Sequence, residues 1–280
     1  MNLETFFNQF ELLADAPNGV QKLRELILQL AVMGKLVPQD ENDEPASILL
    51  ERIKAEKAKL VKENKISKDK KYSSVVSDIP PWNIPSHWQW TRMQNIFEIT
   101  RGGSPRPSKD PRFFGGNIPW ITVNEITKNS EMYLLNTKTG LTDLGSSKSR
   151  FIFDDDILLT NSGATLGVPK ISKIKGCIND GVARLYPFHE YINKQYAYYF
   201  LFGQTQAFRD VNQGMGQPNL NTSILAAWFF PLPPLKEQYR IVKKIDQLMN
   251  YCDELEQQLT KGIEDKEKLI ETAIYQLLAA

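Results

Sequence analysis

Few side chains in this sequence have the types and spacing that catalysis or metal binding requires. His87 and His189 stand far apart, and neither has a cysteine or a second histidine at the spacing of a zinc site. Cys177 and His189 would supply a thiol and a base, but nothing else in the sequence supports a nucleophilic pair. Three aspartates at 154–156 suggest a metal, yet the strand-like residues around them favour an exposed turn. We therefore expect no metal site and no catalytic residue.

The glycine-rich segments do not match the loops that bind nucleotides. No GxxxxGK[ST] segment is present, and no GxGxxG segment follows a strand and opens a helix. The segments RGGSP (101–105) and NSGATLG (161–167) contain glycine, but neither runs into a clear helix whose first turn would bind phosphate. The sequence also lacks the aromatic-ended Asn-Pro-Pro tetrapeptide of adenine methyltransferases. These absences favour a binding or scaffold protein over an enzyme, and we expect no cofactor on this chain.

Composition is that of a globular protein. The 280 residues, 41% hydrophobic and 24% charged, suffice for one large unit or two smaller ones with a core. The formal net charge is +1, so a basic surface would require local clustering of lysine and arginine. The longest wholly apolar run, 224–230, is far shorter than the roughly 20 residues that span a bilayer. With two distant cysteines and no signal-peptide pattern, we expect a cytoplasmic protein without a membrane segment.

Residues 1–70 are predicted to form a helical region, followed by a proline-containing linker over 71–86. Apolar residues recur at spacings of three and four, which predicts one buried helix face: Val20, Leu23, Ile27, Leu30 and Met33. Gly34 is expected to end this helix, and Pro45 to open a second one that runs to about Lys62. Residues 51–71 contain nine basic and four acidic side chains, which is typical of a solvated helix and linker. A phosphate-facing stretch would have the same composition.

Residues 87–235 are predicted to fold as an α+β domain of short strands. Clusters of Gly, Pro, Asn and Ser separate the strand-like segments WQWTRM, NIPWITV, FIFDDDILLT, GVARLYPF and WFFPL. A helical segment over 193–210 interrupts them, and its buried side is expected to carry Tyr196, Tyr199, Phe200 and Phe208.

Residues 236–280 are predicted to form a long helix that needs a partner. Prolines within 231–234 end the preceding domain. Apolar residues then alternate at spacings of four and three, the pattern of a coiled-coil seam: Ile241, Ile245, Leu248, Cys252, Leu255 and Leu259. About 40 helical residues would span roughly 60 Å, more than the domain could cover. We therefore expect the seam to contact a partner chain.

Several segments together resemble the specificity subunits of type I restriction-modification systems. The most specific are PLPPLKEQYRIVKKID (231–246) and GNIPWI (116–121). The stretch from LRELILQL to EKAKL (23–60) resembles their helical region, and IPSHWQWTRMQNIFEITRGGSPRPS (84–108) the start of a target recognition domain. The resemblance covers about residues 1–278.

This resemblance implies a non-catalytic subunit that selects a DNA sequence. Typical members have two target recognition domains, held apart by helices, and each domain reads one half of a bipartite site. The implied partners are double-stranded DNA, a modification subunit that carries S-adenosylmethionine for adenine-N6 methylation, and a restriction subunit. We find one recognition domain in this chain. It is therefore expected either to be truncated or to form a homodimer that reads a split palindrome.

The resemblance implies that loops of the recognition domain contact DNA base edges through hydrogen-bond donors and acceptors. Arginine pairs favourably with guanine, and asparagine or glutamine with adenine. The predicted DNA-binding residues are Arg101, Ser104, Arg106, Lys109, Arg112, Asn124, Asn161, Ser162, Arg184, Gln213, Gln217 and Asn219. For each loop a structural turn is about as good an interpretation, and Trp120 is expected in the core.

Two other classes of protein remain open from the sequence. A fragment of a fused DNA methyltransferase or restriction enzyme would be distinguished by a cofactor loop or an Asn-Pro-Pro motif, and we find neither. A coiled-coil scaffold that does not bind DNA would leave unexplained a domain rich in basic and amide-bearing loops.

Overall fold

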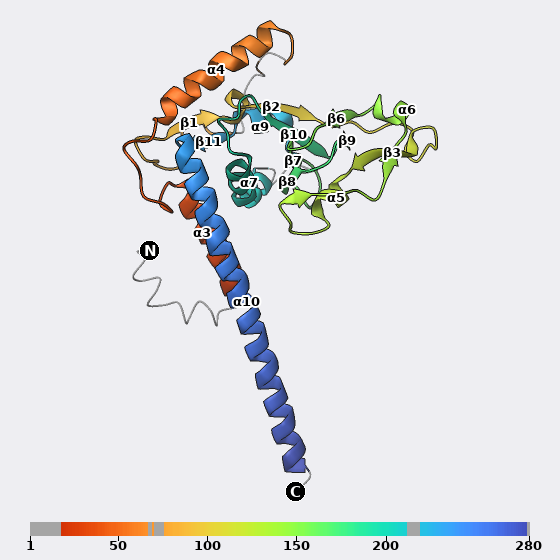
Figure 1. The fold of residues 1–280 in the computed structure, drawn as a ribbon. Coiled ribbons are helices and arrows are strands. Elements are labelled where there is room, and N and C mark those ends of the chain that lie inside the picture. Colours follow the sequence, from red (N-terminus) through yellow and green to blue (C-terminus); the bar gives the residue numbers. More distant parts are fainter. Residues whose placement is uncertain (1–17, 67–68, 70–75, 212–218, 279–280) are drawn as a thin grey trace.

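Residues 18–66, 69, 76–211 and 219–278 are described in the computed structural model, and they form a strand-rich head from which one long helix projects (Figure 1). This mixture of short strands and helices is the predicted α+β fold class. The described helices of the first part are α3 (Gly19–Val32) and α4 (Ala46–Lys62). Gly34 has a φ of 69° just after α3, and Pro45 directly precedes α4, so both boundary predictions are confirmed.

The described strands form three sheets, and all five predicted segments contribute strands to them, the segment 151–160 to two sheets through β6 and β7. The smallest sheet pairs β1 (Gln89–Arg92) with β11 (Phe229–Leu232). The largest has the order β2 (Phe97–Arg101), β10 (Val182–Pro187), β7 (Ile157–Thr160), β8 (Pro169–Ser172) and β4 (Tyr133–Leu134). The third has the order β5 (Gly140–Leu141), β3 (Phe114–Ile121), β9 (Gly176–Ile178) and β6 (Arg150–Ile152).

Short helices connect these strands: η1 (Met93–Asn95), α5 (Val123–Thr127), α6 (Asp143–Ser146), α7 (Lys194–Gly203), α8 (Thr205–Asp210) and α9 (Thr222–Ala227). The predicted helical segment over 193–210 is therefore two helices, α7 and α8. The side chain of Asn193 caps α7 by accepting from the next backbone N–H groups. Tyr196, Phe200 and Phe208 are buried, as predicted, and Tyr199 is partly buried.

One hydrophobic core joins the helices to the sheets. Its buried members come from α3, α4, α7, α10 and strands β2 and β10, among them Ile27, Leu49, Phe97, Phe200 and Ile245. A smaller cluster lies beneath β3 and β6 and includes Ile121, Ile152 and Val182. Trp120 is also buried, as expected. The helices and the head therefore share packing, and the boundaries drawn near residues 70, 86 and 235 stay a prediction.

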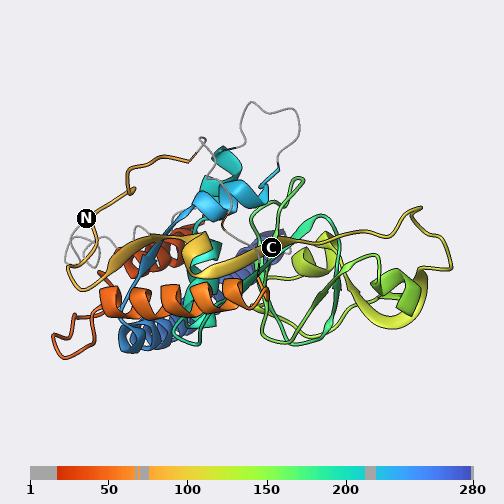
Figure 2. The same ribbon diagram turned by 90° about the horizontal axis from the view of Figure 1, so that it is seen from above.

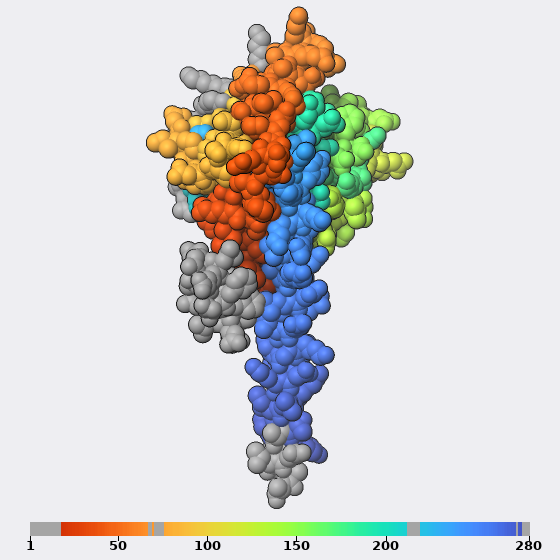
Figure 3. Space-filling view, turned by 60° about the vertical axis from the view of Figure 1, so that its left-hand side comes forward, coloured from red at the N-terminus to blue at the C-terminus, as the bar shows by residue number. Residues whose placement is uncertain are grey.

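The long helix α10 (Leu235–Leu278) contains 44 residues, which corresponds to about 66 Å. Its first half lies antiparallel beside α3, the two helices side by side in Figures 1 and 3. Arg24 of α3 pairs with Asp253 at 2.6 Å and with Glu256 at 2.8 Å. Tyr199 of α7 donates to Asp246 at 2.5 Å.

This packing corrects the expected surroundings of the helix seam. Ile241, Ile245 and Cys252 have exposed fractions of 0, 0 and 1% and belong to the core of their own chain. The other three predicted seam residues, Leu248, Leu255 and Leu259, are partly buried against the same core. Ile241, Ile245 and Cys252 are therefore covered by their own chain, which corrects their predicted place in an interchain seam. For Leu248, Leu255 and Leu259, contact with a second chain stays a prediction. The prediction missed α3 as a partner because heptad spacing identifies an apolar face without identifying what covers it.

The second half of α10 extends past the head. Figure 3 shows it, in the darker blue, running beyond the end of the red-orange α3. Its apolar side chains are well exposed, with fractions of 58% at Ile263, 58% at Ile270 and 50% at Ile274. An apolar face of this kind on a helix is expected to pack against another element.

Candidate nucleic-acid interface

The predicted basic loop leaves the head at a tightly packed root between β2 and β3. The N–H of Gly102 donates to the carbonyl of Val182 at 2.9 Å, and that of Gly103 to Ile178 at 3.1 Å. A Cβ atom at Gly102 would lie 2.1 Å from the carbonyl oxygen of Asn179. Glycine is therefore required here, because only its backbone can approach the β9–β10 turn so closely. Figure 2 shows the yellow β2–β3 connection extending away from the sheets.

Asp180, in the β9–β10 turn, receives hydrogen bonds from several residues of this loop. Its Oδ1 accepts from Ser104 Oγ at 2.5 Å, and its Oδ2 lies 3.3 Å from a guanidinium nitrogen of Arg106. Its backbone carbonyl accepts from Arg101 Nε at 2.7 Å. The turn thus holds the loop through side chains as well as through backbone bonds.

A groove of about 1290 Å³ lies between this loop, α5 and the β4–β5 connection. Four of the predicted DNA-binding residues line it together: Ser104, Arg106, Lys109 and Asn124. The prediction did not include the other polar residues that line the groove, which are Ser108, Thr122, Glu125, Lys128, Lys138, Thr139, Asn179 and Asp180. The segment TKNSEMYLLNTKTG (127–140) has the polar, Lys- and Asn-containing composition of the loops that were selected, so the same criterion could have found Lys128 and Lys138.

The groove is lined by more cationic than acidic side chains. The lining cations are Arg106, Lys109, Lys128 and Lys138, and the acids are Glu125 and Asp180. Glu125 accepts from Lys128 Nζ and from the backbone N–H of Lys138, each at 3.0 Å. Burial favours the protonated form of Glu125, but these hydrogen bonds outweigh it, so the pKa of the carboxyl is lowered. Glu125 thereby fixes α5, which carries Asn124, to the β4–β5 connection.

Arg112 lies on the same loop but is already paired. Its Nε lies 3.1 Å from both carboxylate oxygens of Asp110, and a terminal nitrogen donates to Oδ2 at 2.7 Å. These hydrogen bonds from Arg112 lower the pKa of Asp110. The side chain of Arg112 remains 69% exposed, so it can approach a ligand together with its neighbouring carboxylate.

The surroundings of Arg184 do not favour the predicted DNA contact. Its side chain is 12% exposed, and its Nε donates to Asp156 at 2.7 Å, while Glu98 lies 3.5 Å away. The aromatic rings of Tyr186 and Phe153 flank its guanidinium. Arg184 thus crosslinks β2, β10 and the start of β7 within the sheet. Asp156 is itself buried, so the expected exposed turn at 154–156 is wrong for this aspartate.

The other predicted loops have mainly structural positions in the described residues. Asn161 is 1% exposed, and its backbone bonds to Gly181 and Leu220 hold the end of β7. Ser162 and Asn219 form an antiparallel bridge that joins two loops. Neither Asn161, Ser162 nor Asn219 lines the groove. Gln213 and Gln217 lie outside the described residues.

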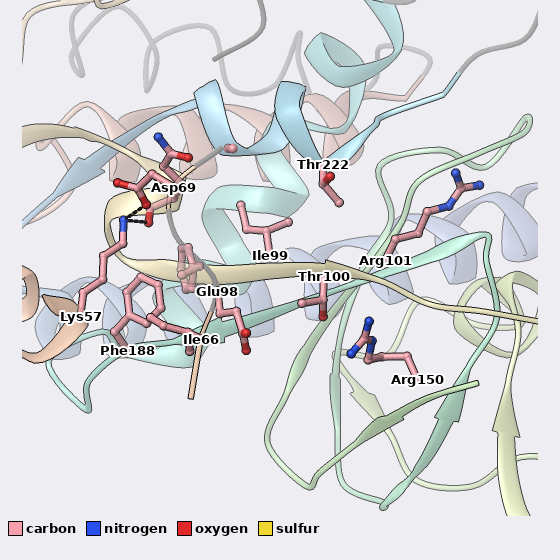
Figure 4. Close-up of a pocket in the computed structure, with 13 residues that line it drawn as sticks. Lys57, Ile66, Asp69, Glu98, Ile99, Thr100, Arg101, Arg150, Phe188 and Thr222 are labelled. Carbon is pink, nitrogen blue, oxygen red and sulfur yellow. Dashed lines mark hydrogen bonds and ion pairs between the residues drawn. The ribbon is translucent and has the colours of Figure 1, made fainter. Parts of the chain in front are cut away.

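Arg101 lines a different, smaller cavity of about 300 Å³ on the other side of the loop root. In Figure 4, Arg101 and Arg150 lie at one end of this cavity, with Thr100 between them and Glu98. At the other end, Lys57 pairs with Asp69 and donates to the carbonyl of Gln94 at 2.8 Å. Arg101 is therefore separated from the groove that contains Arg106 and Lys109.

No cluster of three or more His, Cys, Asp or Glu side chains able to hold a metal occurs among the described residues. Within those same ranges, no helix is both long enough and apolar enough to cross a membrane.

Comparison with known proteins identifies the class to which this fold and groove belong. The family model for the type I restriction modification DNA specificity domain matches residues 85–265. The chain belongs to this family. The match covers β1, the groove and the first two thirds of α10, so it includes both the head and the root of the projecting helix.

Particular relatives agree with this assignment. The chain is 34% identical over 275 residues to the type I restriction enzyme EcoAI specificity subunit of Escherichia coli, covering 91% of the chain and 44% of that protein. It is 34% identical over 277 residues to the EcoEI specificity subunit of the same organism, covering 91% of the chain and 43% of the relative. The chain therefore spans less than half the length of these relatives.

Two solved structures share the fold. The HsdS subunit from Thermoanaerobacter tengcongensis has a TM-score of 0.52 at 19% identity, covering 91% of this chain and 52% of that one. A structure described as showing complex assembly and conformational transition of the type I R-M system has a TM-score of 0.56 at 20% identity. It covers 91% of this chain and 57% of the other. At these identities the likeness concerns the fold alone.

Proposed function

We propose that the chain acts as a DNA-specificity subunit of a type I restriction-modification complex and catalyses no step itself. The observation that carries this proposal is the groove beside loop 101–113, where cations and amide or hydroxyl groups line one surface in a member of this family. Such a surface suits double-stranded DNA, because cations bind phosphates and amides or hydroxyls bind base edges.

Within the groove, the side chains divide by chemistry into two roles. Arg106, Lys109 and Lys138 are the candidates for phosphate contacts, which would set the position of the DNA. Asn124, Thr122 and Asn179 have the hydrogen-bonding groups that distinguish base edges. We assign Arg112 to the edge of this surface. Arg184, Asn161, Ser162 and Asn219 are assigned to holding the domain together, and Arg101 to the root of the loop.

The second half of α10 is proposed to pair with the same segment of a second copy. Its exposed apolar side chains need a partner, and the relatives are more than twice as long as this chain, so two copies would restore their length. A twofold dimer would present two heads to DNA and read a split palindrome, with the unread spacer set by the helices. A modification subunit, carrying S-adenosylmethionine, and a restriction subunit are proposed to dock on this helical part.

Genome-wide mapping of methylated adenines, with the gene present and deleted, tests this function. We expect one motif with two symmetric halves to lose methylation on deletion and to regain it on complementation. An unchanged set of methylated adenines would contradict the function. A motif that disappears but has two unrelated halves would contradict the symmetric dimer alone.

A further inference from the structure

We propose that Asp180 is a positioning residue for sequence reading. On this view it fixes the root of the β2–β3 loop before DNA binds, so that Ser104 and Arg106 meet the DNA in one arrangement. This inference rests on the proposed function and adds to it a residue that does not itself contact the bases.

The geometry places Asp180 in a turn that contacts two walls of the groove. On one side it accepts from Ser104, Arg106 and Arg101 of the loop. On the other side, the neighbouring Gly181 packs so closely on α5 that a Cβ atom there would lie 2.6 Å from Val123. The turn therefore sets the distance between the loop and the helix that carries Asn124.

Ser104 and Asp180 bond to each other in both directions. The Ser104 hydroxyl donates to Oδ1 at 2.5 Å, and the same Oγ lies 3.4 Å from the Asp180 backbone N–H. Ordering such side chains in the free protein lowers the entropy that binding must remove, and this preorganisation strengthens contacts that depend on direction. Arg106 remains 73% exposed while held, so its other nitrogens are available to a ligand.

The charge of Asp180 makes the inference testable. A half-exposed carboxylate beside a phosphate-binding groove opposes DNA binding by simple electrostatics. If Asp180 had no other role, Asp180→Asn would strengthen binding to every sequence alike. If it positions the loop, the same substitution strengthens binding to unrelated DNA about twofold while reducing the preference for the target about tenfold or more. The two effects have opposite signs.

The experiment uses the chain assembled with its modification subunit and a duplex library with randomised positions. The wild-type complex first selects its target, and the affinities for that duplex and for a scrambled duplex are then measured for each variant. The matched control is Asp154→Asn, which makes the same change of charge in the exposed β6–β7 turn, away from the groove. We expect the control to keep the wild-type preference.

Two further variants separate positioning from direct contact and from misfolding. Asp180→Glu keeps the charge but changes the length, so we expect reduced preference without stronger binding to scrambled DNA. Adding Ser104→Ala to Asp180→Asn should lower the preference by less than the sum of the two single losses, because the two changes remove the same Ser104–Asp180 contact. Equal preference of Asp180→Asn and wild type, or fully additive losses in the double variant, would overturn the inference. A wild-type complex that selects no sequence would instead refute the proposed function.

Discussion

Side chains of the same type have very different environments in this domain. Arg106 is largely exposed in the groove, Arg112 is exposed but paired with Asp110, and Arg184 is mostly covered and lies between two carboxylates. The sequence pointed to the basic loop because arginine and lysine cluster there beside glycine and proline, and its contact with DNA stays a prediction. It could not distinguish Arg184, because its partners Glu98 and Asp156 come next to it only through strand pairing with β2 and β7.

At the residue scale, the groove cations are predicted to contact phosphates. Lys109→Ala should weaken DNA binding at all sequences and reduce the slope of log affinity against log salt by about 1, since one fewer counterion is released. Fluorescence anisotropy over a salt series measures both quantities. Lys175→Ala is the matched control, because Lys175 is similarly exposed but lies at the far end of β9. A slope that changes equally in both variants would rule out a local phosphate contact at Lys109.

Glu125 gives a prediction about pH. Its pKa in the folded chain is lowered from the ordinary value of 4.5, so its stabilising contribution is present above about pH 4.5 and is lost as the pH falls through the folded value. Glu125→Gln should therefore lower the free energy of unfolding by about 1 kcal/mol at pH 7, with a smaller difference from wild type at pH 3.5. Urea unfolding at the two pH values measures this. The exposed Glu264→Gln should show neither effect, and a pH-independent loss at Glu125 would contradict the ionic contribution.

At the scale of elements, the two halves of α10 have different surroundings. Ile245 is fully buried against its own chain, whereas Ile270 is exposed. Ile245→Ala should lower the free energy of unfolding by about 2–5 kcal/mol, because it leaves a cavity in the core. Ile270→Ala makes the same chemical change and should leave the folded monomer within about 0.5 kcal/mol of wild type.

The same pair of variants tests the proposed dimer. Analytical ultracentrifugation should show weaker self-association for Ile270→Ala than for wild type, since apolar contact between copies is lost. Denaturant unfolding at low protein concentration measures the monomer separately. Unchanged self-association in Ile270→Ala would argue against pairing through the second half of α10.

The elements themselves were largely predictable, and their contacts were not. The apolar spacing, Gly34 and Pro45 locate the helix boundaries well because these are local backbone effects. Strand existence was also predictable, although the parallel pairing of β3 with β9 was not, since it joins segments more than 50 residues apart. For the same reason α3 was missed as the neighbour of the helix seam, and Asp180 as the anchor of the loop.

At the scale of the whole molecule, α10 is predicted to set the separation of two DNA-reading heads. Inserting one heptad after Lys261 adds about 10 Å of helix, which corresponds to about three base pairs of spacer. The methylated motif of the insertion variant, determined by sequencing, should keep its two halves and lengthen the gap between them. The control keeps the original helix length and permutes the exposed residues of one heptad. An unaltered spacer in the insertion variant would contradict a role of α10 in setting the spacer length.

The common core of the head and the first half of α10 has a consequence for how such a protein can change its target. Because the head shares a core with the first half of α10, we expect it to turn whenever the helix is extended by a length that is not a whole number of turns. One added residue would rotate a head by about 100°, taking its groove off the DNA, whereas seven would rotate it by only about 20°. Functional length variants in the second half of α10 are therefore expected to differ by multiples of seven residues. The unread spacer between the two halves of the motif should then change by a fixed number of base pairs per heptad.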